Sequence, residues 1–77
     1  MTLLAPAPTT RLAAITLTEA EPGFWVANAD GAFAGTVDHH GDHFYVRDCF
    51  SQYLGDYSDL TAATARLRAD ATARDAA

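Results

Sequence analysis

The chain has 77 residues, among them ten acidic residues, five arginines and no lysine, and its formal net charge is −5. This charge disfavours a nonspecific nucleic-acid binder, because such proteins need many cations to displace the counterions of the phosphate backbone. Cys49 is the only cysteine, which excludes an internal disulfide and suits a reducing compartment.

The length fits one small domain, which we expect to span residues 11–73. Residues 1–10 contain Ala-Pro-Ala-Pro and are predicted to be a flexible tail, whereas residues 74–77 lack a cap and are predicted to fray. The apolar run at residues 3–5 is too short for a signal peptide or a membrane span. We therefore expect a cytoplasmic protein with no membrane partner.

The first predicted strand lies at about residues 12–18, where Ile15 and Leu17 alternate with threonines. A helix is the competing interpretation, but the β-branched residues favour a strand. The pattern leaves open whether this strand pairs with the others in a sheet. The dipeptide Pro22-Gly23 then predicts a turn.

Three further apolar runs, each typical of a strand, follow at residues 24–27, 33–37 and 44–46. Asp30-Gly31 separates the first two runs and suits a two-residue type I′ turn, in which both residues have positive φ. Gly41-Asp42 separates the second run from the third and suits a type II′ turn. The two loops together predict an antiparallel β-meander of three to four strands.

Two-residue loops also predict which strand residues pair, and residues that pair lie on the same face of a sheet. The predicted core face carries Phe24, Val26, Phe33, Val37, Phe44 and Val46. The predicted opposite face carries Trp25, Ala27, Ala34, Thr36, Asp38, His40, His43, Tyr45 and Arg47. Each hairpin independently gives one face of apolar side chains and one face of mostly polar or small side chains. This agreement favours the predicted register.

The C-terminal third is predicted to turn at residues 48–51, to extend over 52–54 and to end that extension at Gly55. Ser58 is a candidate N-cap for a helix over residues 59–73. The apolar stripe of this helix is Leu60, Ala63, Leu67 and Ala71. The fold class is therefore α+β, with one C-terminal helix packed on one face of the meander. The predicted core is Ile15, Leu17, Phe24, Val26, Phe33, Val37, Phe44, Val46, Leu60 and Leu67.

Three histidines and two aspartates lie within residues 38–43. The predicted register places His40 opposite His43, with Asp38 on the same face, and two imidazoles at this spacing could share a zinc or nickel ion. A plain solvated hairpin explains the same residues, and no fourth ligand is evident. We therefore expect no metal and no cofactor, with these three residues as weak metal candidates.

Aromatic and arginine side chains on the predicted opposite face form the candidate partner site, namely Trp25, Thr36, Tyr45 and Arg47. Exposed Trp, Tyr and Arg are typical of the centres of protein interfaces. The alternative is that Trp25 is covered by other parts of the chain or belongs to the core. No nucleophile elbow, Cys-His pair or phosphate loop is recognisable, so we do not expect an enzyme.

The stretch from Phe24 to Leu67 resembles, in layout, the three-stranded-sheet-plus-helix domains of the AP2 and integrase arm-binding type. The residues that carry the resemblance are Phe-Tyr-Val-Arg-Asp at 44–48, Tyr-Leu-Gly-Asp-Tyr-Ser-Asp-Leu at 53–60, Ala63 and Leu67. In such domains the sheet face away from the helix enters the major groove of DNA. Those domains line that face with several basic residues, whereas this chain has Arg47 there.

Three functional hypotheses follow. The leading one is a small interaction module, a regulator, inhibitor or accessory factor, that binds a protein partner or itself through the sheet face opposite the helix. The alternative is nucleic-acid binding by that face. A second alternative is an acidic DNA mimic, in which Asp38, Asp42, Asp48, Asp56 and Asp59 stand in for phosphates.

Overall fold

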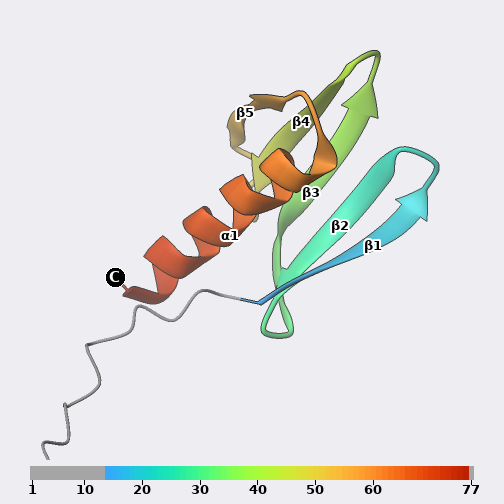
Figure 1. Cartoon of the computed structure of the whole chain (residues 1–77). Helices are drawn as coiled ribbons and strands as arrows, with labels where there is room; N and C mark the ends of the chain where they lie inside the picture. The colour runs from blue at the N-terminus through green and yellow to red at the C-terminus, as the bar shows by residue number, and fades with distance from the viewer. Residues whose placement is uncertain (1–13, 77) are drawn as a thin grey trace, which may run out of the picture.

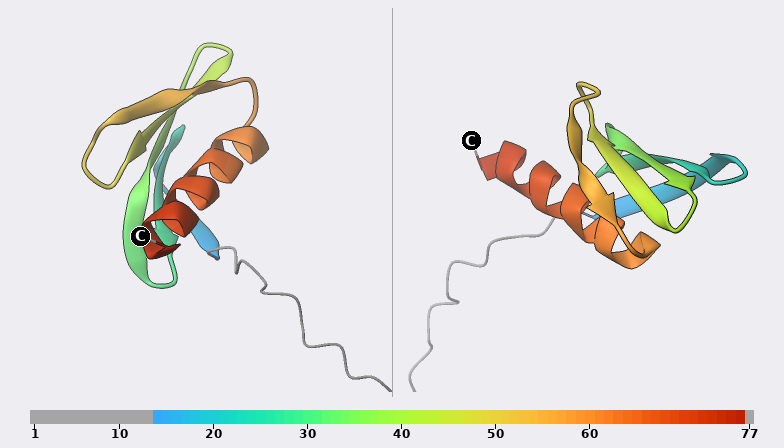
Figure 2. Two further views of the ribbon diagram at one scale, coloured as in Figure 1. Left: turned by 90° about the vertical axis from the view of Figure 1, so that its left-hand side faces the viewer. Right: turned by 90° about the horizontal axis from the view of Figure 1, so that it is seen from above.

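The computed structural model describes residues 14–76 of the chain, so the predicted tail at residues 1–10 lies outside the described part (Figure 1). The elements in chain order are β1 (Ile15–Glu21), β2 (Phe24–Ala29), β3 (Ala32–His40), β4 (His43–Asp48), β5 (Tyr53–Tyr57) and α1 (Leu60–Ala76). The strands form one antiparallel sheet in the order β1-β2-β3-β4-β5. The helix lies against one face of this sheet in the views of Figures 1 and 2.

The α+β class and the C-terminal helix are confirmed, but the predicted number of strands is too low, because the sheet has five. The first strand pairs with β2 along most of its length, so the question left open by the sequence is answered. Gly55 does not end the extended segment before the helix. It lies in the middle of β5, opposite Val46.

The β3–β4 hairpin has the predicted register. His40 pairs with His43 across the two-residue Gly41-Asp42 loop, and Val37 pairs with Val46 farther along. The φ of Gly41 is +59°, which suits the first position of the predicted turn.

The β2–β3 hairpin begins with the predicted type I′ loop, since Asp30 and Gly31 both have positive φ. The pairs next to the loop are also as predicted, but Ala34 is an extra residue without a partner in β2, which makes a β-bulge. Beyond the bulge the predicted register is wrong by one residue. Trp25, not Phe24, pairs with Val37.

This shift exchanges the two faces of β2. Trp25 and Ala27 lie on the side of the helix, and Phe24 and Val26 lie on the opposite side. Ala27 is fully buried and Trp25 packs against the core, with its ring centroid 5.9 Å from that of Phe44. The prediction that Trp25 lies on the face opposite the helix is therefore wrong.

The core consists of small and medium side chains, because the helix lies very close to the sheet. Its buried members are Ala27, Ala34, Val37, Val46, Ala63, Leu67 and Ala71. Of the ten predicted core residues, three are among these buried members, namely Val37, Val46 and Leu67. Four more pack against them while partly buried, namely Ile15, Leu17, Phe44 and Leu60. The other three, Phe24, Val26 and Phe33, belong to neither group, and Phe33 is 49% exposed. The predicted helix stripe is confirmed at Ala63, Leu67 and Ala71.

Two carboxylates hold the ends of the C-terminal elements. Asp59, not the predicted Ser58, caps α1, because its Oδ1 accepts a hydrogen bond from the backbone N–H of Ala62 at 2.7 Å. Asp48 is 3% exposed, and its Oδ1 accepts hydrogen bonds from the backbone N–H groups of Phe50 and Gln52. Its buried position prevents Asp48 from acting as a surface phosphate mimic.

Arg74 joins the end of α1 to the turn between β4 and β5. Its Nη2 lies 2.9 Å from Asp48 Oδ2, and its Nε lies 3.0 Å from Asp70 Oδ2. Its guanidinium also lies over the ring of Phe50, 4.8 Å from the ring centroid. These contacts fix the turn against the helix. No helix in residues 14–76 has the length and apolarity needed to cross a bilayer.

Candidate binding face on the sheet opposite the helix

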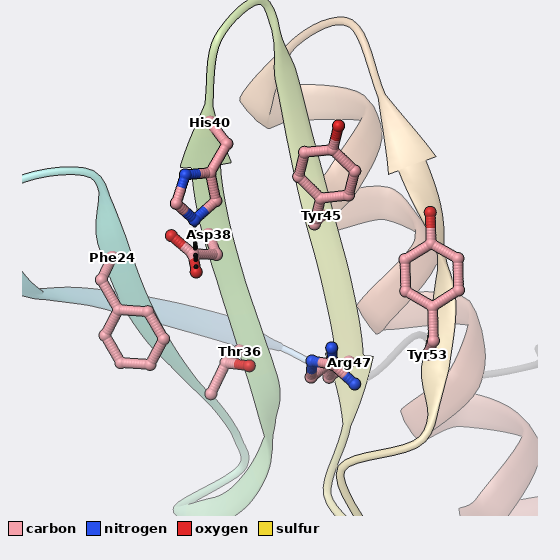
Figure 3. A pocket seen from close by; sticks show the side chains of 7 residues that line it. All are labelled: Phe24, Thr36, Asp38, His40, Tyr45, Arg47 and Tyr53. Carbon is pink, nitrogen blue, oxygen red and sulfur yellow. Dashed lines mark hydrogen bonds and ion pairs between the residues drawn. The ribbon is translucent and has the colours of Figure 1, made fainter.

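The sheet face opposite α1, which we call the open face, is hollowed over β2 to β5. The concavity has a volume of about 430 Å³. Its lining residues, shown in Figure 3, are Phe24, Thr36, Asp38, His40, Tyr45, Arg47 and Tyr53. They come from four strands, so the fold must be complete before this surface exists.

Strand register arranges the lining residues in rows. One row runs from Thr36 through Arg47 to Tyr53, and the next contains Asp38 and Tyr45. A second β-bulge in β5 produces the first row, because Leu54 is an extra residue between the partners of Val46 and Arg47. Without this bulge the side chain opposite Arg47 would be Leu54, which instead packs toward the core.

Aromatic rings occupy both sides of the concavity. Tyr53 is 54% exposed and Tyr45 is 36% exposed, while Phe24 on the far strand is partly buried. In Figure 3 the hydroxyl groups of both tyrosines point toward the β3–β4 loop and away from Arg47. Tyr and Arg are enriched at the centres of protein interfaces.

Arg47 is the arginine that lines the concavity. Its Nη1 donates one hydrogen bond, 3.3 Å long, to the backbone oxygen of Ser51. Within residues 14–74 no carboxylate oxygen lies within 4.0 Å of its guanidinium. Arg74 differs from Arg47 in this respect, because its guanidinium is paired with both Asp48 and Asp70. The Arg47 guanidinium therefore has donors to offer to a ligand.

The acidic groups of the open face are each engaged near the β3–β4 loop. Asp38 Oδ2 lies 3.1 Å from His40 Nε2, and Asp56 Oδ2 lies 3.0 Å from His43 Nδ1. The Tyr53 hydroxyl donates to Asp56 Oδ1 at 3.2 Å. Desolvation, followed by this hydrogen bond and the negative charge of Asp56, raises the pKa of Tyr53.

The metal hypothesis has no supporting geometry. The imidazoles of His40 and His43 each contact a separate carboxylate, Asp38 and Asp56 respectively, and do not converge on one point. In the described part of the chain no three His, Cys, Asp or Glu side chains are grouped so that they could hold an ion.

Three of the four predicted partner-site residues, Thr36, Tyr45 and Arg47, line the concavity together. Trp25 lies on the other face, for the register reason given above. The sequence reasoning missed Phe24 and Tyr53, which line the concavity because of the two bulges. Gly35 and Gly55 were the available signals, since an isolated glycine inside a strand pattern often marks a bulge.

Comparisons with protein-family models, with curated proteins and with solved structures return no match to this chain. The resemblance to the AP2 and integrase arm-binding domains thus extends to a small antiparallel sheet followed by a C-terminal helix.

Proposed function

We propose that this protein is a non-enzymatic interaction module that binds a protein partner on its open face. The observation that carries the proposal is the concavity, which holds two exposed tyrosines and an arginine that has no carboxylate partner among residues 14–74. Tyr and Arg dominate the binding energy of many interfaces, because they bury large areas and lose little conformational freedom.

The described residues 14–74 supply no observation that favours an enzyme over this module. Ser51 and Cys49 make no hydrogen bond to a histidine there. The two histidines that contact a carboxylate, His40 and His43, lie next to the β3–β4 loop and are exposed. A nucleophile needs such a base within hydrogen-bond reach.

A capture experiment with matched variants tests the proposal. The protein is immobilised, exposed to a lysate of its source organism, and every captured protein is identified, purified and titrated against the module by calorimetry. Tyr45→Ala and Tyr53→Ala should each weaken the reconstituted complex by at least about tenfold, as expected for interface hot spots. Phe50→Ala is the control, because Phe50 is 70% exposed but lies in the turn held against the helix.

The proposal fails if no captured protein binds the purified module, or if Phe50→Ala weakens binding as much as the tyrosine variants do. Circular dichroism of each variant establishes that the fold is retained.

Nucleic-acid binding by the open face is the second candidate. Aromatic rings on a sheet face beside an arginine can stack on unpaired bases, which is how several single-strand binders work. A titration with a single-stranded oligonucleotide and with duplex DNA at low salt tests it. Binding that weakens steeply as salt is added would support this candidate, and no binding at low salt would remove it.

A further inference from the structure

The open face is electrically polarised along its length. Arg47 lies at one end of the concavity, beside the turn between β4 and β5, and Asp38 with His40 lies toward the β3–β4 loop (Figure 3). A ligand that matches this pattern carries its negative group at the Arg47 end. The backbone at Arg47 has a strand on each side, because Arg47 is paired with Thr36 in β3 and with Tyr53 in β5.

The immediate neighbours of Arg47 suit a carboxylate that is attached to an apolar group. The Thr36 hydroxyl can donate a second hydrogen bond to the same anion, since Thr36 is directly across the strand pair. The rings of Tyr45 and Tyr53 lie on the side of Arg47 that faces the β3–β4 loop, and their hydroxyls are at the end farthest from the guanidinium (Figure 3). Guanidinium and carboxylate form bidentate, charge-assisted hydrogen bonds, which are among the strongest in proteins.

On the basis of the proposed function, we propose that the occupant of the open face is an acidic peptide segment of a protein partner. A side-chain or C-terminal carboxylate of this segment binds Arg47 and Thr36. A neighbouring aromatic or branched apolar side chain packs between the rings of Tyr45 and Tyr53.

The distribution of charge favours one carboxylate over a polyanion. Among residues 14–74, Arg47 is the one arginine that lines the concavity, and His40 beside it is held by Asp38, which lines the concavity too. Asp56 lies across the strand pair from Tyr45. A nucleic-acid strand that placed one phosphate on Arg47 would bring its next phosphates toward these carboxylates, which repel them. A single peptide carboxylate avoids this repulsion.

A fragment titration followed by NMR tests the proposal without a known partner. The 15N-labelled protein is titrated with phenylacetate, which combines a ring with a carboxylate, and with its neutral analogue phenylacetamide. Saturable shifts of the backbone amides of Thr36, Tyr45, Arg47 and Tyr53 with phenylacetate, and at least about tenfold weaker binding of phenylacetamide, are the expected results.

The variants Arg47→Gln and Arg66→Gln remove the same charge from different places, because Arg66 is exposed on α1. Arg47→Gln should abolish the difference between phenylacetate and phenylacetamide, and Arg66→Gln should leave it unchanged. Arg47→Lys keeps the charge but loses the planar fork, so it should give intermediate affinity. Equal binding of the two fragments to the wild type, which requires no variant to fold, overturns the proposal.

Other occupants give different results. Tighter binding of a single-stranded oligonucleotide than of phenylacetate at the same amides overturns the proposal in favour of nucleic acid. Sedimentation that shows a dimer in the wild type and a monomer in Arg47→Gln overturns it in favour of a second copy of this chain.

The fragment experiment and the capture experiment test the two proposals independently, so the failure of one proposal can be told from the failure of the other. Suppose that a reconstituted partner binds Tyr45→Ala weakly but binds Arg47→Gln as tightly as the wild type. This result would support the interaction module and contradict the acidic segment as its ligand. Suppose instead that phenylacetate binds through Arg47 but no protein partner of the open face is found. This result would support an anion-binding position at Arg47 and contradict the interaction module.

Discussion

Leu67 of α1 lies directly against the backbone of Gly35 in β3. A Cβ atom added to Gly35 would be 2.8 Å from Leu67 Cδ2 and 2.2 Å from the backbone oxygen of Arg47. Real Cβ atoms do not approach other heavy atoms so closely. This contact sets the separation between helix and sheet, and it lies beside the bulge that turns Trp25 toward the helix and Phe24 toward the open face.

Gly35→Ala should therefore destabilise the fold by about 3 kcal/mol or more, because overpacking adds to the strain of an L residue at a φ of +146°. Urea unfolding measured by circular dichroism gives the free energy of unfolding. Gly41→Ala is the control, since Gly41 has a φ of +59° and nothing within 4 Å of an added Cβ. It should cost about 1–2 kcal/mol from the backbone alone. Equal costs for the two variants would contradict the close approach of the helix.

Trp25→Ala should lower stability rather than remove a binding contact. The Trp25 side chain packs on the core and its ring lies 5.9 Å from that of Phe44, so its removal should cost about 2–4 kcal/mol. Tyr53→Ala, at a side chain that is 54% exposed, should change the free energy of unfolding by about 1 kcal/mol or less. A Trp25→Ala protein as stable as the wild type would show that the ring is not part of the core.

Asp48→Asn should remove stability at neutral pH and have less effect in acid. Burial opposes the charged form of Asp48, but hydrogen bonds from the N–H groups of Gln52 and Phe50, with the charge of Arg74, outweigh it and lower its pKa below the usual 3.8. A lowered pKa contributes stability above the unfolded-state pKa, and this contribution is lost as pH falls through the folded-state value.

The difference in free energy of unfolding between wild type and Asp48→Asn should thus be constant above about pH 5 and shrink below about pH 4. Asp42→Asn, at the exposed tip of the β3–β4 loop, serves as the control for the loss of one negative charge. A difference that stays constant down to the acid transition would rule out this role of Asp48.

Tyr53 should titrate above the ordinary pKa of tyrosine, which is 10.0. Desolvation is the largest cause of this raised pKa, and the hydrogen bond to Asp56 and the negative charge of Asp56 add to it. Asp56→Asn should therefore lower the pKa of Tyr53. NMR of 13C-labelled tyrosine measures this directly. A raised pKa also means that this group contributes stability below about pH 10 that is lost as pH rises through the folded-state pKa. If Asp56→Asn leaves the Tyr53 titration unchanged, the hydrogen bond is not formed in solution.

The two-residue loops and the helix stripe could be predicted because their signals are local. Asp30 and Gly31 both adopt positive φ, a requirement that few residues other than glycine, Asn and Asp meet. Ala63, Leu67 and Ala71 are buried because the period of a helix places them on one side. The candidate site could be predicted in part for the same reason, since Thr36, Tyr45 and Arg47 belong to the hairpin whose register was predicted without error.

The composition and the local patterns of the sequence by themselves determined an antiparallel meander, its hairpin loops and a C-terminal helix. Only the tertiary structure decided which face of β2 and β5 meets the helix. Ala34 and Leu54 are extra residues in their strands, and a single extra residue moves every side chain beyond it to the other face. The bulge at Ala34 adjoins Gly35, against which Leu67 packs. This contact joins a strand to a helix far along the chain, so the period of one strand cannot predict it. These two bulges place Phe24 and Tyr53 on the open face.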